Sequence, residues 1–261
     1  MPNDSVAFDR AADYYDNTRG FPAGVETEIG ALMVQAGGLT ATSRVLEIGV
    51  GTGRIALPVA PHVGAYYGVD LARPMMDRLR AKQLDEPITL VQGDITRLPF
   101  ADASFDAVIA VHIFHLIPAW RDALREVARV LRPGAPLLHG GNGRMIVDGL
   151  QEVWNKASNE SREADGAIPH DQRATFLAAN GWREIGSPQT HRFVTYRSPE
   201  EFLNSIRQRH FSSMWRMDDE TIARGLAAAQ AYIDAHFEDP TRPEALESSF
   251  NVQAYLPPKW D

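Results

Sequence analysis

Three glycines stand at alternate positions directly after a short apolar run in residues 45–54, VLEIGVGTGR. They are Gly49, Gly51 and Gly53, and one acid, Glu47, precedes the first of them. Glycine lets a ligand approach the backbone where a Cβ atom would collide, and such a turn exposes N–H groups at the positive end of the helix that follows. The pattern therefore predicts a loop that holds a cofactor.

The spacing of this loop separates the classes of cofactor. A dinucleotide-binding loop reads G-x-G-x-x-G and requires a small residue at position 54, where this chain has Arg54. A phosphate-binding P-loop requires G-K-[ST], which the sequence does not contain. The spacing therefore disfavours a nicotinamide-dependent oxidoreductase, an alternative that a test of cofactor binding decides.

Two further acids follow strand-like runs. Asp70 ends the run AYYGVD, and a carboxylate there can accept hydrogen bonds from both hydroxyls of a ribose. Asp94 ends the run ITLVQGD, where it can accept a hydrogen bond from an adenine amino group while Ile95 packs on the ring. Together with the glycine loop, these acids predict the binding of an adenosine.

Strand-like and helix-like runs alternate through the first half of the chain. The expected strands are residues 44–48, 65–70, 88–94, 105–112 and 136–140, and the expected helices are residues 53–60, 74–83 and 119–134. Alternation of this kind indicates right-handed crossovers and a parallel sheet with helices on both faces. Such sheets bind ligands at the carboxyl ends of their strands, where the glycine loop and both acids are expected.

The pattern changes after about residue 142. Helices are expected over residues 149–166 and 220–237, and two more strands over 183–196, broken at Pro188, and 248–256. The predicted organisation has four parts, listed in chain order. They are a cofactor-binding core with N-terminal helices (1–142), its continuation (143–197), a helical lid that caps the substrate (198–240) and the last strand of the core (241–261).

Four stretches carry a resemblance to a known family. VLEIGVGTGR, GVDLARPMMDRLRAK, VQGDITRLPFADASFDAV and LREVARVLRPGAPLL resemble, in this order, the motifs of class I S-adenosylmethionine-dependent methyltransferases. They are most similar to the small-molecule branch that includes the ubiquinone and menaquinone biosynthesis methyltransferases. The resemblance covers about residues 8–140. It implies an α/β fold with a doubly wound, seven-stranded, mostly parallel sheet, a helical lid, and S-adenosyl-L-methionine as cofactor.

The resemblance also implies roles for individual residues at the cofactor. Those at the nucleoside and amino-acid ends are Glu47, Gly49, Gly51 and Gly53 (amino-acid end), Asp70 (ribose), Leu71 and Met75 (beside the adenosine), Asp94 and Ile95 (adenine), and Val111 and His112 (methionine end). A Tyr-Asp-x-x-Arg segment of the family matches Tyr15, Asp16 and Arg19, so that Arg19 would pair with the cofactor carboxylate and Tyr15 would cover it. Val50 departs from the pattern, because many relatives have a smaller or polar residue there.

Candidates for catalysis and substrate binding follow the fourth strand and lie in the predicted lid. His115 is the candidate general base for an acceptor that must lose a proton, although a polar residue packed under the lid is an equal interpretation. Substrate-pocket candidates are Arg144, Tyr196, Phe211 and Trp215, with the face of a helix core as the alternative for the last two. No metal is expected, because His112 and His115 have no evident third ligand.

Composition restricts the partners. The formal charge is −8 and no run of Lys and Arg exceeds two residues, which argues against nucleic acid as a partner. Nucleic-acid amino-methyltransferases have an Asn/Asp-Pro-Pro-aromatic motif after the fourth strand, where this chain reads AVHIFH. The absence of cysteine excludes thiolate chemistry, and no apolar run approaches the ~20 residues of a membrane span. A cytoplasmic protein is predicted, with a homodimer as one option for its assembly.

The predicted function is in-line transfer of a methyl group from S-adenosylmethionine to a small organic acceptor. Two alternatives stay open: a non-catalytic module that binds S-adenosylmethionine, and the less favoured nicotinamide-dependent oxidoreductase. The sequence leaves the acceptor undecided between oxygen, nitrogen and carbon.

Overall fold

The computed structural model describes residues 8–143, 149–158 and 173–258. The chain divides into two compact units. The core unit comprises residues 1–141, 165–191 and 250–261, and the helical unit comprises residues 142–164 and 192–249. This division differs from the four parts expected from the sequence, because the two last strands each run from one unit into the other.

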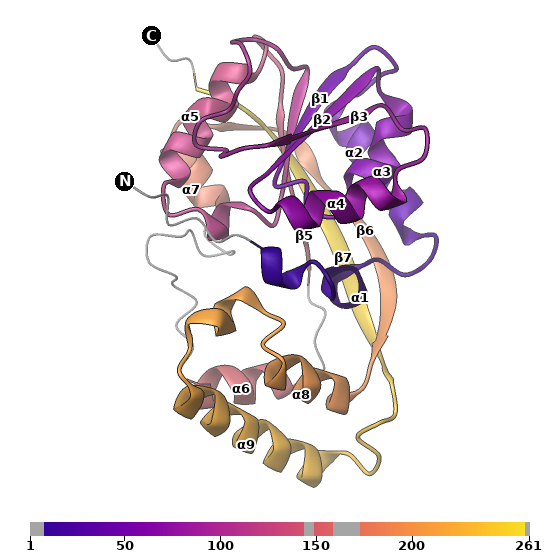
Figure 1. The fold of residues 1–261 in the computed structure, drawn as a ribbon, viewed down its shortest axis with the longest axis vertical. Helices are drawn as coiled ribbons and strands as arrows, with labels where there is room; N and C mark the ends of the chain where they lie inside the picture. Colours follow the sequence, from indigo (N-terminus) through magenta and orange to yellow (C-terminus); the bar gives the residue numbers. More distant parts are fainter. Residues whose placement is uncertain (1–7, 144–148, 159–172, 259–261) are drawn as a thin grey trace. The chain divides into compact units, whose positions relative to one another are not determined.

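One seven-stranded sheet has the order β3-β2-β1-β4-β5-β7-β6 (Figure 1). Its strands are β1 (Arg44–Ile48), β2 (Ala65–Asp70), β3 (Ile88–Gln92), β4 (Ala107–Val111), β5 (Leu137–Asn142), β6 (Arg183–Arg197) and β7 (Glu244–Leu256). The first five strands pair in parallel, and β7 lies between β5 and β6. The expected α/β class with a doubly wound, mostly parallel seven-stranded sheet is confirmed.

The helices of the core unit precede β1 and connect several of its strands (Figure 1). They are the 3₁₀ turn η1 (Asp9–Ala11), α1 (Tyr15–Arg19), α2 (Val25–Gly37), α3 (Ala56–Val59), η2 (Ala60–His62), α4 (Arg73–Lys82), η3 (Phe114–Leu116), α5 (Trp120–Val130) and α7 (Arg173–Ala179). The helix expected from residue 53 begins only at Ala56, because Gly53 has a φ of 83°, outside the helical region.

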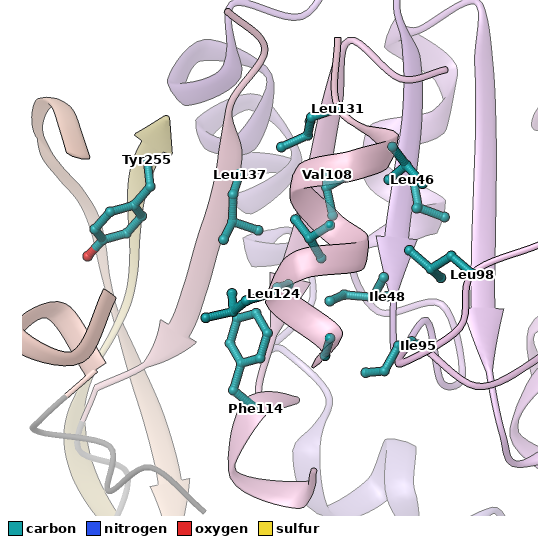
Figure 2. Packing of buried hydrophobic residues seen from close by; sticks show 14 of the residues in the cluster. Leu46, Ile48, Ile95, Leu98, Val108, Phe114, Leu124, Leu131, Leu137 and Tyr255 are labelled. Carbon is teal, nitrogen blue, oxygen red and sulfur yellow. The ribbon is translucent and has the colours of Figure 1, made fainter. Parts of the chain in front are cut away.

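An apolar face of α5 builds the core on one side of the sheet. Trp120, Leu124 and Val127 are buried at helical spacing and belong to one cluster with strand residues such as Val108 and Leu137. Figure 2 shows the side chains of this cluster between helix and sheet. The cluster anchors the carboxyl ends of β1 and β4, where the glycine loop and η3 begin.

The break expected at Pro188 is wrong, since β6 continues from Arg183 to Arg197. The sheet order places β6 at an edge, where only one side of the strand is paired. Proline lacks an N–H group and is tolerated in a strand whose unpaired side faces solvent. Pro188 therefore does not interrupt β6, because the strand lies at the edge of the sheet, and the local sequence does not reveal that position.

The helical unit has its own apolar core. Its helices are α6 (Leu150–Ser158), α8 (Pro199–Arg207), the 3₁₀ turn η5 (Ser212–Arg216) and α9 (Asp219–His236). Trp154 is fully buried among residues of α8 and α9. A capping box starts α8, in which Ser198 accepts from the Glu201 N–H and the Glu201 carboxylate accepts from the Ser198 N–H. The predicted helix 149–166 matches α6 as far as Ser158, and the rest lies outside the described residues.

No helix in the described part of the chain is long and apolar enough to cross a membrane.

Candidate functional site

The glycine loop leaves the end of β1 and is fixed against β2. The N–H groups of Gly49 and Val50 both donate to Val69 O, at 2.8 and 3.1 Å. Gly49, Gly51 and Gly53 all have positive φ, of 72°, 53° and 83°, a region that side chains rarely adopt. The alternate glycines are therefore required by the turn itself, and a Cβ atom on Gly49 or Gly53 would also lie only 2.6 Å from the side chain of Ile113 or Leu79, respectively.

Asp70 connects this loop to the end of β2. One carboxylate oxygen accepts from the Gly51 N–H and the other from the Ala72 N–H, both at 2.8 Å. Burial raises the pKa of Asp70, and these two backbone donors oppose the rise. Each carboxylate oxygen has about two lone-pair sites, so both can also accept from a ribose hydroxyl.

Glu47 lies beneath the loop. Its side chain is only 2% exposed, and its Oε2 accepts a hydrogen bond of 2.8 Å from the hydroxyl of the buried Tyr66. Burial raises the pKa of Glu47 to about 8, with the Tyr66 hydrogen bond and the charge of Arg54 opposing the rise and Asp70 adding to it. Burial therefore favours the neutral form of this carboxyl.

The N-terminal segment is attached to the loop by polar contacts. Asp16 of α1 accepts from the hydroxyl of the buried Thr52 at 2.5 Å, and its second oxygen pairs with Lys82 of α4 at 2.8 Å. Arg54 donates to Arg19 O at 2.7 Å. These contacts join α1, the glycine loop and α4, which are far apart in sequence.

A small apolar cluster around Tyr15 packs beside the glycine loop. Tyr15 packs against Ala12, Ala72 and Met75, and its ring meets Phe8 edge-on at 6.1 Å between centroids. Met75 is buried at the start of α4 and lies near Gly51, where a Cβ atom would be 3.4 Å from the Met75 Cε. The structure thus brings Tyr15 and Met75, two of the predicted cofactor residues, into one cluster beside the loop.

The predicted adenine residues follow β3. An Asp94 carboxylate oxygen accepts from the Thr96 N–H at 2.8 Å, which forms a tight turn. Ile95 is 5% exposed and belongs to the core cluster, as Figure 2 shows. Leu71 follows Asp70 directly, and its carbonyl accepts from the Gln92 side chain at 3.0 Å.

The segment after β4 carries the predicted histidines. Val111 ends the strand, and His112 follows with a φ of 52°, which turns the chain sharply. Histidine is among the non-glycine residues that tolerate this region. His115 lies half-buried in η3, next to the buried Phe114. The roles of both histidines stay predictions.

The structure does not gather the predicted substrate residues into one cluster. Tyr196 is 68% exposed. Phe211 packs against the core of the helical unit, and the Trp215 indole N–H donates to Arg209 O at 2.7 Å. Arg144 lies outside the described residues. Their part in binding a substrate stays a prediction, as does the lid role of residues 198–240.

Two residues of the site were missed as functional candidates. Asp16 is part of the Tyr-Asp-x-x-Arg match but was given no role of its own. Its hydrogen bond with Thr52 attaches α1 to the glycine loop. Tyr66 was counted only as part of a strand, although it shares a sheet face with Glu47 once the register is known. The described residues contain no group of three His, Cys, Asp or Glu placed to hold a metal ion.

Comparisons with known proteins agree with one family. A family model described as a methyltransferase domain matches residues 46–138. A demethylmenaquinone methyltransferase of Roseiflexus sp. (strain RS-1) is 30% identical over 210 residues, which are 72% of this chain and 86% of that protein. A fatty-acid O-methyltransferase of Mycolicibacterium smegmatis is 35% identical over 147 residues. That match covers 53% of this chain and 54% of the relative, so the chain spans about half of the relative's length.

A solved structure shares the fold. Phospholethanolamine N-methyltransferase 2 of Haemonchus contortus, in complex with phosphomonomethylethanolamine and S-adenosylhomocysteine, superposes with a TM-score of 0.54 and 19% identity. The match covers 96% of this chain and 58% of that one. At this identity the likeness establishes the fold alone.

Proposed function

Because this chain belongs to the family of S-adenosylmethionine-dependent methyltransferases, we propose that it transfers a methyl group from S-adenosylmethionine to a small organic acceptor. The observation that carries the proposal is the glycine loop, whose three glycines have left-handed backbone geometry, whose Gly51 N–H donates to Asp70, and which directly follows the strand that bears the buried Glu47. The loop and the two acids fit a ligand that combines ribose hydroxyls with a cationic amino-acid end.

The proposed contacts fall into two groups, one at the adenosine and one at the amino-acid end of the cofactor. Asp70 accepts from the ribose hydroxyls, while Met75 and Leu71 pack beside the adenosine. Asp94 accepts from the adenine amino group and Ile95 packs on its ring. Glu47 receives the ammonium group, Arg19 pairs with the carboxylate, Tyr15 covers it, and Val111 and His112 line the methionine end. These assignments rest on the family motifs and on the contacts described for each residue.

When bound, S-adenosylmethionine supplies a methyl group on a sulfonium, which carries its own leaving group. The residues of the chain therefore have to bind, orient and exclude water. Orientation of two reactants contributes up to about 7–11 kcal/mol in favourable cases. For an acceptor that must lose a proton, His115 takes that proton at a ring nitrogen. An acceptor that is already nucleophilic needs only positioning.

A small acceptor is supported by charge and by the relatives. The formal charge of −8 without a basic run disfavours a polyanionic partner. The relatives are named for a fatty acid and for demethylmenaquinone, which are both small and differ in chemistry. These relatives support a small acceptor, and an experiment has to identify the atom that is methylated.

Calorimetric titration tests the cofactor class. The protein is titrated with S-adenosylhomocysteine, and with NAD and NADP in parallel. Saturable binding of S-adenosylhomocysteine alone is expected, and binding of a nicotinamide dinucleotide in its place would overturn the proposal. Transfer of a labelled methyl group into a metabolite extract then identifies the acceptor.

A further inference from the structure

The hydroxyl of Tyr66 contacts the carboxyl of Glu47, which precedes the glycine loop. Glu47 of β1 pairs with Gly68 of β2 in the parallel register, so Tyr66, two positions earlier on β2, lies on the same face of the sheet. On this shared face the Glu47 carboxyl accepts a hydrogen bond of 2.8 Å from the Tyr66 hydroxyl. Tyr66 is itself completely buried, which fixes the position of its hydroxyl.

The surroundings of Glu47 make this hydrogen bond important. On β2 it faces Tyr66 and Asp70, and after β1 it faces Arg54, while its neighbour on β4 is the apolar Ile109. A buried carboxyl needs hydrogen-bond partners, because each unsatisfied polar atom in the interior is unfavourable. Tyr66 supplies a donor to one oxygen only, Oε2.

We propose that Tyr66 is a positioning residue for the cofactor, which holds Oε2 of Glu47 so that Oε1 receives the ammonium group of the amino-acid end. The inference rests on the proposed function and concerns a residue that contacts the cofactor only through Glu47. Because the phenol donates to Oε2, the proton of the neutral carboxyl sits on Oε1. Binding of the cationic group releases this proton to solvent and breaks no other bond.

Proton release gives the proposal a measurable sign. Burial raises the pKa of Glu47 to about 8, so binding of the cationic group at neutral pH is expected to release a proton from this carboxyl. Removing the phenol hydroxyl removes a donor to the ionised form and moves the midpoint of binding to higher pH. A purely structural role of Tyr66 would weaken binding equally at every pH.

The experiment measures S-adenosylhomocysteine affinity by calorimetry from pH 6 to pH 9, in buffers of different ionisation enthalpy, for wild type, Tyr66→Phe, Glu47→Gln and the double variant. We expect Tyr66→Phe to bind about ten-fold more weakly at pH 7, with its midpoint about one pH unit higher and the deficit shrinking toward pH 9. Glu47→Gln should release no proton from this side chain, so the pH dependence of its affinity reports the titration of the ligand's own amine. Tyr67→Phe, which removes a neighbouring phenol outside this pair, should bind like wild type.

The double variant decides whether Tyr66 acts through Glu47. Adding Tyr66→Phe to Glu47→Gln should change affinity less than two-fold, and a full additional loss would overturn the proposal. A deficit of Tyr66→Phe that is constant with pH would overturn it as well. If Tyr66→Phe does not fold, difluorotyrosine at position 66, a stronger donor of nearly the same shape, should lower the midpoint, and an unchanged midpoint contradicts the proposal. Wild type that binds no S-adenosylhomocysteine would refute the proposed function itself.

Discussion

Both units of this protein have an apolar core, and the core unit adds a set of polar contacts at its glycine loop. In the core unit, polar contacts at the glycine loop join segments distant in sequence, such as Asp16 with Thr52 and Asp70 with Gly51. In the helical unit, apolar side chains from α6, α8 and α9 surround Trp154. Polar contacts fix individual atoms in place, whereas an apolar cluster fixes volume and shape.

This difference bears on where binding residues are found. At the glycine loop, the carboxylates of Asp70 and Glu47 can accept further hydrogen bonds beyond their structural contacts. In the helical unit, Phe211 contributes to the unit's own core and the Trp215 N–H is used by Arg209 O. The comparison predicts that cofactor affinity depends on the core unit alone, and substitutions in either unit test it.

The largest effect is expected for Trp154→Ala. Truncation of a fully buried tryptophan lowers the free energy of unfolding by about 3–5 kcal/mol. We expect an early unfolding transition in urea that leaves the affinity for S-adenosylhomocysteine nearly intact, measured by circular dichroism and calorimetry. Trp182→Ala, which makes the same deletion in the cluster of the core unit, should instead lose binding with its first transition. Loss of binding in the early transition of Trp154→Ala would contradict the comparison.

Asp70→Ala should produce the next largest effect. It removes the acceptor for the Gly51 and Ala72 N–H groups and the proposed partner of the ribose. We expect the affinity for S-adenosylhomocysteine to fall about 100-fold, equivalent to about 2.7 kcal/mol. Asp70→Asn, which keeps one acceptor oxygen, should lose less. An alanine variant that binds as tightly as wild type would refute the ribose assignment.

A third prediction concerns Val50, the departure from the family pattern. A Cβ atom on Gly68 would lie 2.7 Å from the Val50 Cγ2, so the bulky residue is accommodated by the glycine on the neighbouring strand. Gly68→Ala should lower the free energy of unfolding by about 1–3 kcal/mol. Val50→Ala in the same chain should recover part of that loss, and a double-mutant cycle from urea denaturation measures the coupling. Strictly additive effects would show that the two residues do not compete for space.

The smallest effect is expected in the pH dependence of stability. Between about pH 4.5 and pH 8 folded Glu47 keeps a proton that the unfolded chain has released, so the free energy of unfolding falls as pH rises. Glu47→Gln abolishes this slope, so its stability relative to that of the wild type should rise between pH 5 and pH 8, although it binds cofactor less well. Thermal unfolding at pH 5 and pH 8 measures the difference. Parallel pH profiles of the two proteins would exclude a protonated Glu47.

Much of the core unit could be predicted from the sequence. The strands β1 and β2 have the expected bounds, because short apolar runs bounded by turn residues specify buried strands. Asp70 ends β2 as expected, whereas β3 ends at Gln92 and leaves Asp94 two residues beyond the strand. The positive φ of all three glycines agrees with the loop expected from their spacing.

What could not be predicted depends on pairing between distant segments. Tyr66 reaches Glu47 only because Glu47 pairs with Gly68, and strand register is not visible in one strand alone. The contact of Asp16 with Thr52 likewise depends on where the N-terminal segment docks. Helix α3 is shorter than expected because the left-handed Gly53 delays its start.

The course of β6 has a consequence for association with other chains. An edge strand of this length presents a row of backbone donors and acceptors that can template the addition of a foreign strand. In β6, Pro188 lacks a donor and Gly186, with a φ of 66°, departs from extended geometry two positions earlier. Continuous strand addition is interrupted at this point, so β6 is protected from edge-to-edge aggregation, and a dimer built by joining two β6 edges would have to leave this stretch unpaired.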